Sequence, residues 1–162
     1  MHGRRTLAPA LFLFALLHGT TAAADAAENA PPEVQYRQTL MEIVGSNMGA
    51  IGDIMKNRLD LPGHIAVHAG EMADSAKLIA PAFKKNVSTE WTDAKPDIWT
   101  DWKKFESAIA DFEEAARNLE AAAKGSDPSA VGPAMKALGK SCGGCHKPFR
   151  KPKEESFKNK KR

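Results

Sequence analysis

Hydrophobic residues recur at alternating steps of three and four along most of the chain, which places them on one face of an α-helix. The pattern covers residues 32–58, 62–84, 96–124 and 128–151, and no convincing strand pattern accompanies it. Four such segments with short or moderate connections predict an all-α protein, an antiparallel up-down-up-down four-helix bundle.

The apolar seam of segment 32–58 contains a charged residue. Its apolar positions are Val34, Met41, Val44, Met48, Ile51 and Met55. Arg37 stands where the spacing requires another apolar side chain. Because burying a charge is costly unless it is paired, Arg37 is expected to be buried beside an anionic group.

The last segment carries both cysteines of the chain on its apolar seam. The seam consists of Val131, Met135, Leu138, Cys142, Cys145 and Phe149. Gly125 is expected to end the preceding helix. Ser126 or Asp127 is expected to cap the last helix, with Pro128 in its first turn. The two thiols should therefore face the interior of the bundle.

The run Cys-Gly-Gly-Cys-His at residues 142–146 is the attachment pattern of c-type haem. Cys142 and Cys145 would hold one haem c covalently, and His146 would supply an axial nitrogen to iron. A thioredoxin-like redox pair would need βαβ surroundings, which are absent from the pattern. A zinc site would need a fourth ligand, for which only His64 and His68 stand elsewhere in segments 32–151.

His64 and His68 share a helix face at a spacing of four, with Glu71 nearby, which is one arrangement that binds a surface metal. The sequence favours solvated histidines over a metal site. No Ser/His/Asp set, paired catalytic carboxylates or Gly-rich phosphate loop is visible. The chain is therefore not expected to be an enzyme.

The N-terminus has the pattern of a secretory signal peptide. Arg4 and Arg5 precede an apolar run at 7–17, and small residues follow. We expect residues 1–24 to be removed by cleavage after Ala24, with cleavage after Ala26 as the alternative. The apolar run is shorter than the ~20 residues of a membrane span, so no span is expected in the mature chain. Export to the periplasm agrees with the haem motif, because c-type haem is attached outside the bacterial cytoplasm.

Charge adds one feature to this picture. The 23 basic and 20 acidic residues give no indication of a nucleic-acid partner. Residues 150–162 nevertheless contain seven Lys and Arg against Glu154 and Glu155. The bundle domain is expected to span residues 25–150. The basic tail that follows it, residues 151–162, is expected to be solvated and frayed. A docking patch for an acidic partner is the alternative.

Three stretches resemble a known family. These are Tyr-Arg-Gln-Thr-Leu-Met at 36–41, Pro-Asp-Ile-Trp at 96–99 and the block Gly-Lys-Ser-Cys-Gly-Gly-Cys-His-Lys-Pro-Phe-Arg at 139–150. They resemble cytochrome c′ and its low-spin relatives, the class II c-type cytochromes. The resemblance implies a four-helix bundle, often homodimeric, with haem c near the C-terminal helix. The outer faces of the first two segments show no decisive apolar patch for a dimer.

The resemblance also implies roles for single residues. Arg37 and Gln38 match positions that contact a haem propionate, which agrees with the need of a buried arginine for an anion. Arg150 matches a proximal arginine of gas-binding members, beside His146. Its spacing alone fits equally well an exposed arginine at a helix C-terminus.

Met41 matches the position that faces iron opposite His146. In the low-spin relatives a methionine here ligates iron, whereas cytochrome c′ proper leaves iron five-coordinate and open to small gases. A core side chain is a third interpretation, because Met48 and Met55 continue the same stripe. The expected function is periplasmic electron transfer by a monohaem cytochrome with His146 and Met41 as iron ligands, docking periplasmic redox proteins near the haem edge. The alternative is a five-coordinate cytochrome c′ that binds NO or CO.

Overall fold

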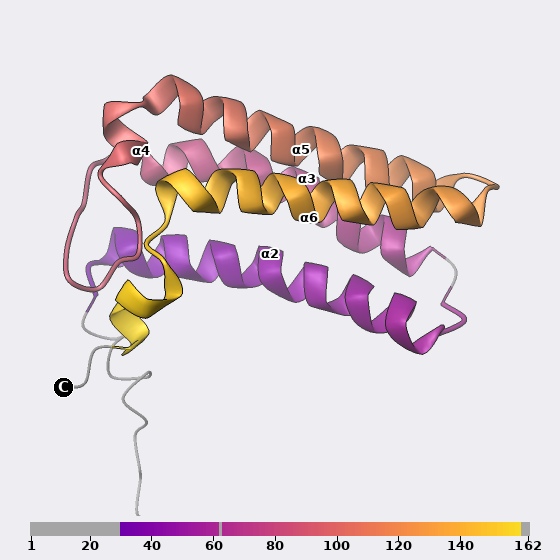
Figure 1. The fold of residues 1–162 in the computed structure, drawn as a ribbon. Helices are drawn as coiled ribbons and strands as arrows, with labels where there is room; N and C mark the ends of the chain where they lie inside the picture. The colour runs from indigo at the N-terminus through magenta and orange to yellow at the C-terminus, as the bar shows by residue number, and fades with distance from the viewer. Residues whose placement is uncertain (1–29, 62, 160–162) are drawn as a thin grey trace, which may run out of the picture.

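The computed structural model describes residues 30–61 and 63–159, so the expected signal peptide at 1–24 and the chain end at 160–162 lie outside it. Successive long helices run antiparallel (Figure 1), which confirms the predicted four-helix bundle. Within the described ranges the long helices are α2 (Pro32–Asn57), α3 (His64–Phe83), α5 (Trp102–Lys124) and α6 (Val131–Phe149). None of the described helices is long and apolar enough to cross a membrane.

The helices do not pack equally on one another. α2 packs on α3, α3 on α5 and α5 on α6, whereas α2 and α6 come close at few points. The largest fully buried side chains of the core are Leu40, Ile51, Met72, Ile98, Leu119, Leu138 and Val34. The bundle is therefore tightly packed on three sides and less closed between its first and last long helices.

α2 carries two apolar stripes where the sequence predicted one. The buried stripe consists of Val34, Arg37, Leu40, Asn47, Ile51 and Ile54. Met41, Val44 and Met48 form a second, half-buried stripe that packs against the core. Met55 is 37% exposed, so its predicted place in the seam is wrong. The stripes separate because α2 faces two different neighbours, α3 on one side and the gap toward α6 on the other.

The predicted helix over 96–124 is interrupted. The short helix α4 (Asp97–Thr100) comes first, and Asp101 leaves helical geometry (φ −126°, ψ 56°) before α5 begins. Tertiary contacts fix α4 as an element separate from α5. Ile98 is 2% exposed, and the indole of Trp99 donates a hydrogen bond to the Phe83 carbonyl at 2.7 Å. These contacts override the continuous helical pattern.

The predicted helix over 128–151 is also shorter at both ends. Pro128–Ala130 forms a 3₁₀ turn (η1), whose cap is Asp127, accepting a hydrogen bond from the Ser129 amide at 2.9 Å. α6 ends at Phe149, and the next residue pairs with Ala94 in an isolated β-bridge. Gly125 ends α5 as predicted, with φ −73° and not in the left-handed region.

Arg37 is buried at the C-terminal end of α3. It is 3% exposed, and its Nε donates to the Ala82 carbonyl at 2.9 Å and its Nη1 to the Val87 carbonyl at 3.2 Å. Nη2 donates to the Lys85 carbonyl. The last carbonyls of a helix lack partners within the helix and form the negative end of its dipole. Arg37 therefore joins α2 to the end of α3 and to the connection at 84–96.

Two aromatic rings complete the surroundings of this guanidinium. Its central carbon lies 4.7 Å from the ring centroid of Phe83 and 5.5 Å from that of Trp99. Cation–π contacts of this kind are favourable, more so when water is excluded. The buried charge is thus stabilised by carbonyl dipoles and ring faces, and an anion is not required for it to be buried.

The C-terminal residues 151–159 are not a frayed tail, contrary to the first of the two expectations. The Lys151 amide donates to the Asp93 carbonyl at 2.7 Å, and Phe157 is only 6% exposed. Two 3₁₀ turns, Lys153–Glu155 and Phe157–Asn159, fold the segment back on the bundle. An apolar side chain and several hydrogen bonds outweigh the charge of this segment.

Replacing Arg37 by Ala should lower the free energy of unfolding by about 3–5 kcal/mol, because hydrogen bonds to a charged donor contribute more than neutral ones and buried carbonyls would lose their partner. Arg37→Lys should recover part of the loss, since it keeps a charge but not the fork of donors. Urea denaturation monitored by circular dichroism measures the change. Lys104→Ala on the exposed face of α5 is the control. A loss below about 1 kcal/mol at Arg37 would contradict the proposed anchoring.

Candidate functional site

A cavity of about 480 Å³ is lined by residues of α2 and α6, of α4 and of the C-terminal segment. Figure 1 shows that α4 and the C-terminal segment lie at the same end of the bundle. The volume of the cavity is within the range of small-molecule and cofactor sites, roughly 300–1,000 Å³. Most of its lining is apolar and comes from every long helix. Representative residues are Met41, Val44 and Met48 of α2, Ile109 and Phe112 of α5, and Phe149 of α6.

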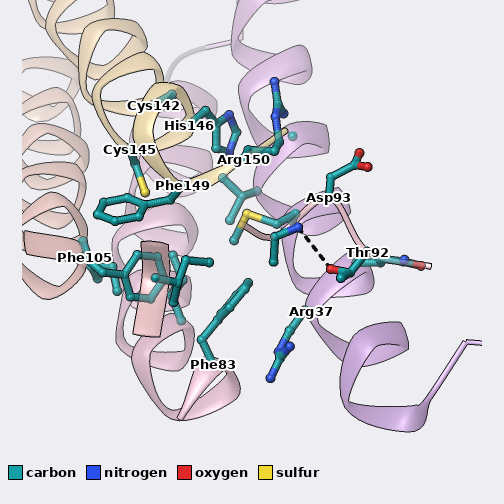
Figure 2. A pocket seen from close by; sticks show the side chains of 18 of the residues that line it. Arg37, Phe83, Thr92, Asp93, Phe105, Cys142, Cys145, His146, Phe149 and Arg150 are labelled. Carbon is teal, nitrogen blue, oxygen red and sulfur yellow. Dashed lines mark hydrogen bonds between the residues drawn. The ribbon is translucent and has the colours of Figure 1, made fainter. Parts of the chain in front are cut away.

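Cys142, Cys145 and His146 all line this cavity. They lie on one face of α6 because residues three and four apart are neighbours on a helix. All three are half-buried, and the two thiols are free. Figure 2 shows the Cys145 sulfur and the His146 ring on the α6 side of the pocket. The prediction that the two cysteines face the interior is confirmed.

The surroundings of the motif set its protonation. Burial, and then the neighbouring Cys142, raise the pKa of Cys145 to about 11. Burial likewise raises the pKa of Cys142. Burial first and the Arg150 charge second lower the pKa of His146. At neutral pH the thiols are therefore protonated and the imidazole is neutral, and neutral imidazole is the form that ligates metals.

The alternative metal site is not supported. Across residues 30–61 and 63–159, no three or more His, Cys, Asp or Glu side chains gather closely enough to hold a metal ion. His68 instead bonds through Nδ1 to the Asn47 side-chain oxygen at 2.8 Å, with a Glu71 oxygen 3.8 Å away. His64 is exposed.

The α2 side of the cavity holds the other predicted residues. Met41 is half-buried and lines the cavity with Val44 and Met48. The cavity stripe is separate from the buried stripe of α2, but Met41 also packs against the core, so its role as an iron ligand or as a core side chain stays a prediction. Gln38 also lines the cavity, and its Nε2 donates to the Trp91 carbonyl at 2.8 Å.

Both predicted arginines line the cavity in different ways. Arg37 directs Nε and both terminal nitrogens at carbonyls, which leaves part of its five N–H groups for another acceptor. Contact of Arg37 and Gln38 with a propionate stays a prediction. Arg150 is exposed just past α6, and its amide donates to the His146 carbonyl at 2.9 Å.

Sequence reasoning missed one wall of the cavity. Thr92 and Asp93 of the connection at 84–96 and Phe157 and Lys158 of the C-terminal segment all line it. The one signal in the sequence was Phe157, the single aromatic residue of the polar, basic stretch 151–162. Its burial depends on a contact with residues more than sixty positions earlier, which no local pattern reveals.

The residues present fit a haem c. The cavity is apolar and of suitable volume, and two thiols and a neutral imidazole lie along one helix face within it. The cations Arg37, Arg150 and Lys158 among its lining suit the carboxylates that such a group carries.

Comparisons with known proteins agree with this fit. A profile of the family Cytochrome C' matches residues 32–150. Cytochrome c' of Rhodospirillum rubrum is 35% identical over 132 residues, which cover 81% of this chain and 89% of that protein. Cytochrome c-556 of Rhodopseudomonas palustris is 34% identical over 124 residues, covering 72% and 81%.

Solved structures give the same result. A nitric oxide complex of a variant of cytochrome c prime from Alcaligenes xylosoxidans superposes with a TM-score of 0.67 at 27% identity, covering 75% of this chain and 94% of that one. Cytochrome c prime from Shewanella frigidimarina superposes with a TM-score of 0.64 at 28% identity, covering 74% and 94%. With sequence, fold and cavity in agreement, the chain belongs to the cytochrome c′ family of non-enzymatic haem proteins.

Proposed function

We propose that this protein is a monohaem electron carrier in which Cys142 and Cys145 bind haem c covalently and His146 and Met41 are the iron ligands. The observation that carries the proposal is the place of Met41 and His146, which line one cavity from two different helices, α2 and α6. Haem iron supplies the redox chemistry by cycling between its ferrous and ferric states.

The chain's own residues would prepare the site for this role. The thiols and the imidazole come from consecutive turns of one rigid helix, which fixes their relative positions. The apolar lining excludes water, and a histidine–methionine ligand pair raises the reduction potential. Arg37 and Gln38, which line the cavity from α2, are the proposed contacts for a propionate, and Arg150 is proposed to lie beside the proximal imidazole.

The periplasm is the proposed location. The signal-peptide pattern at residues 1–24 supports export, and haem c is attached in that compartment. Periplasmic redox proteins are the proposed partners.

A second candidate function is binding of NO or CO by a five-coordinate haem. The similarity to a nitric oxide complex of cytochrome c prime from Alcaligenes xylosoxidans favours it. In this case Met41 would remain an apolar side chain of the cavity, and the iron face opposite His146 would be open to small ligands.

Spectra of the purified protein separate the two candidates. If Met41 ligates iron, the ferric and ferrous forms should be low-spin and indifferent to CO, and Met41→Ala should produce a high-spin form that binds CO. Optical and EPR spectra with and without CO provide the measurement. Met48→Ala, a change of the same kind in the same cavity stripe, should behave as the unchanged protein. A high-spin, CO-sensitive spectrum of the unchanged protein would reject Met41 ligation and support the second candidate.

The attachment residues have a separate test. Replacing both Cys142 and Cys145 by Ser should abolish covalent haem, because the thioether bonds need both sulfurs. Denaturing gel electrophoresis followed by a haem stain measures the bound group. Ser141→Ala, adjacent to the motif, should retain the stain. Haem that remains on the double variant after denaturation would show that another residue holds it.

A further inference from the structure

The C-terminal segment 151–159, here called the strap, lies beyond the part of the chain that matches the family, residues 32–150. It begins where the main chain leaves α6 and turns along the connection at 84–96. The Lys151 amide and side chain donate to the carbonyls of Asp93 and Thr92, at 2.7 and 2.9 Å. These contacts set the direction of the strap from its first residue.

Asp93 holds the middle of the strap. One oxygen of its carboxylate accepts from the Ser156 hydroxyl at 2.7 Å, and the other accepts from the Phe157 amide at 2.9 Å. Hydrogen bonds to an ionised carboxylate are stronger than neutral ones. Asp93 therefore acts as a latch that engages two consecutive residues sixty-three and sixty-four positions later in the chain.

The latch puts an aromatic side chain into the cavity wall. Phe157 is 6% exposed and lines the cavity with Thr92 and Asp93. Lys158 follows it, with its Nζ 4.0 Å from a Glu42 oxygen on α2. The strap thus spans from the end of α6 to α2, the two long helices that come close at few points. Figure 2 shows Thr92 and Asp93 across the pocket from Cys142 and His146.

We propose that the strap closes this side of the haem cavity, with Phe157 as the side chain that shields the haem from water and Asp93 as its latch. The proposal rests on the haem attachment of the proposed function. Exclusion of water lowers the local dielectric and favours the state of iron with the smaller charge, the ferrous state. The strap therefore raises the reduction potential and slows access of small solutes to the haem.

The first test concerns the latch and does not depend on redox activity. In the protein as purified, amide hydrogen exchange at Phe157 should be about tenfold faster in Asp93→Asn, because an uncharged amide has one acceptor oxygen instead of two and accepts more weakly than a carboxylate. Glu155→Gln, an isosteric change on the exposed part of the strap, should exchange as the unchanged protein does. Equal exchange in Asp93→Asn and in the unchanged protein would overturn the latch.

The second test concerns shielding. Phe157→Ser should shift the ferric–ferrous equilibrium about threefold toward the ferric form, about 28 mV at 59 mV per decade for one electron. It should also accelerate reduction by dithionite, whereas Phe157→Leu should keep both values near those of the unchanged protein. Potentiometric titration and stopped-flow absorbance measure the two effects. Unchanged potential and rate in Phe157→Ser would overturn the proposal.

Two other results of these experiments also bear on the proposal. If Phe157→Ser yields no folded holoprotein, Phe157→Val, which removes volume without adding a polar group, carries the same expectation with a smaller shift, and its failure to shift overturns the proposal. If the unchanged protein carries no covalent haem, the proposed function fails and the shielding role fails with it. The exchange test separates these cases, because it reports on the latch alone.

Discussion

The haem end of the bundle depends on the hydrogen bonds of Arg37 to the Ala82 carbonyl at the C-terminal end of α3 and to two carbonyls of the connection that follows. A buried guanidinium is tolerated only where its donors and its charge are compensated. Here carbonyl dipoles and the faces of Phe83 and Trp99 provide the compensation. The contact positions the connection at 84–96, which supplies one wall of the cavity and the carboxylate that holds the strap. One arginine in an apolar seam thus orders two segments that are distant in sequence.

The cavity follows from unequal packing. Small residues such as Ala69, Ala73 and Ala76 let α3 approach its neighbours closely, whereas α2 and α6 are held apart. An apolar cavity of about 480 Å³, were it closed and dry, would cost on the order of 10 kcal/mol at ~24 cal/mol per Å³. That is comparable with the total stability of a domain. A flat apolar group held by two thiols would act as part of the core, so haem binding and folding are expected to be coupled in this family fold.

The features that could be predicted from the sequence are those that depend on residues close together in the chain. The four long helices, the end of α5 at Gly125 and the inward face of Cys142 and Cys145 follow from periodicity and capping residues. The sequence did not predict the break at Asp101, which depends on the contact of Trp99 with α3. It merged the two stripes of α2, because a period of three and four residues does not say how many neighbours a helix has. The order of the strap was hidden by its charge, since the deciding residue, Phe157, contributes little to an average over the segment.

The choice between electron transfer and gas binding depends on the separation of α2 and α6, because Met41 of α2 and His146 of α6 would have to reach the same iron. Their direct packing is sparse, so their separation at the haem end is set by indirect contacts. Arg37 ties α2 to α3, and Lys158 lies near Glu42 of α2 at the end of the strap. A His146–Met41 ligand pair would add a link through iron between these helices. In a five-coordinate protein the indirect contacts alone would hold α2 in place, and the α2 side of the cavity would be free to adapt to a small ligand. The strap is therefore more important to the geometry of the site in the second case than in the first.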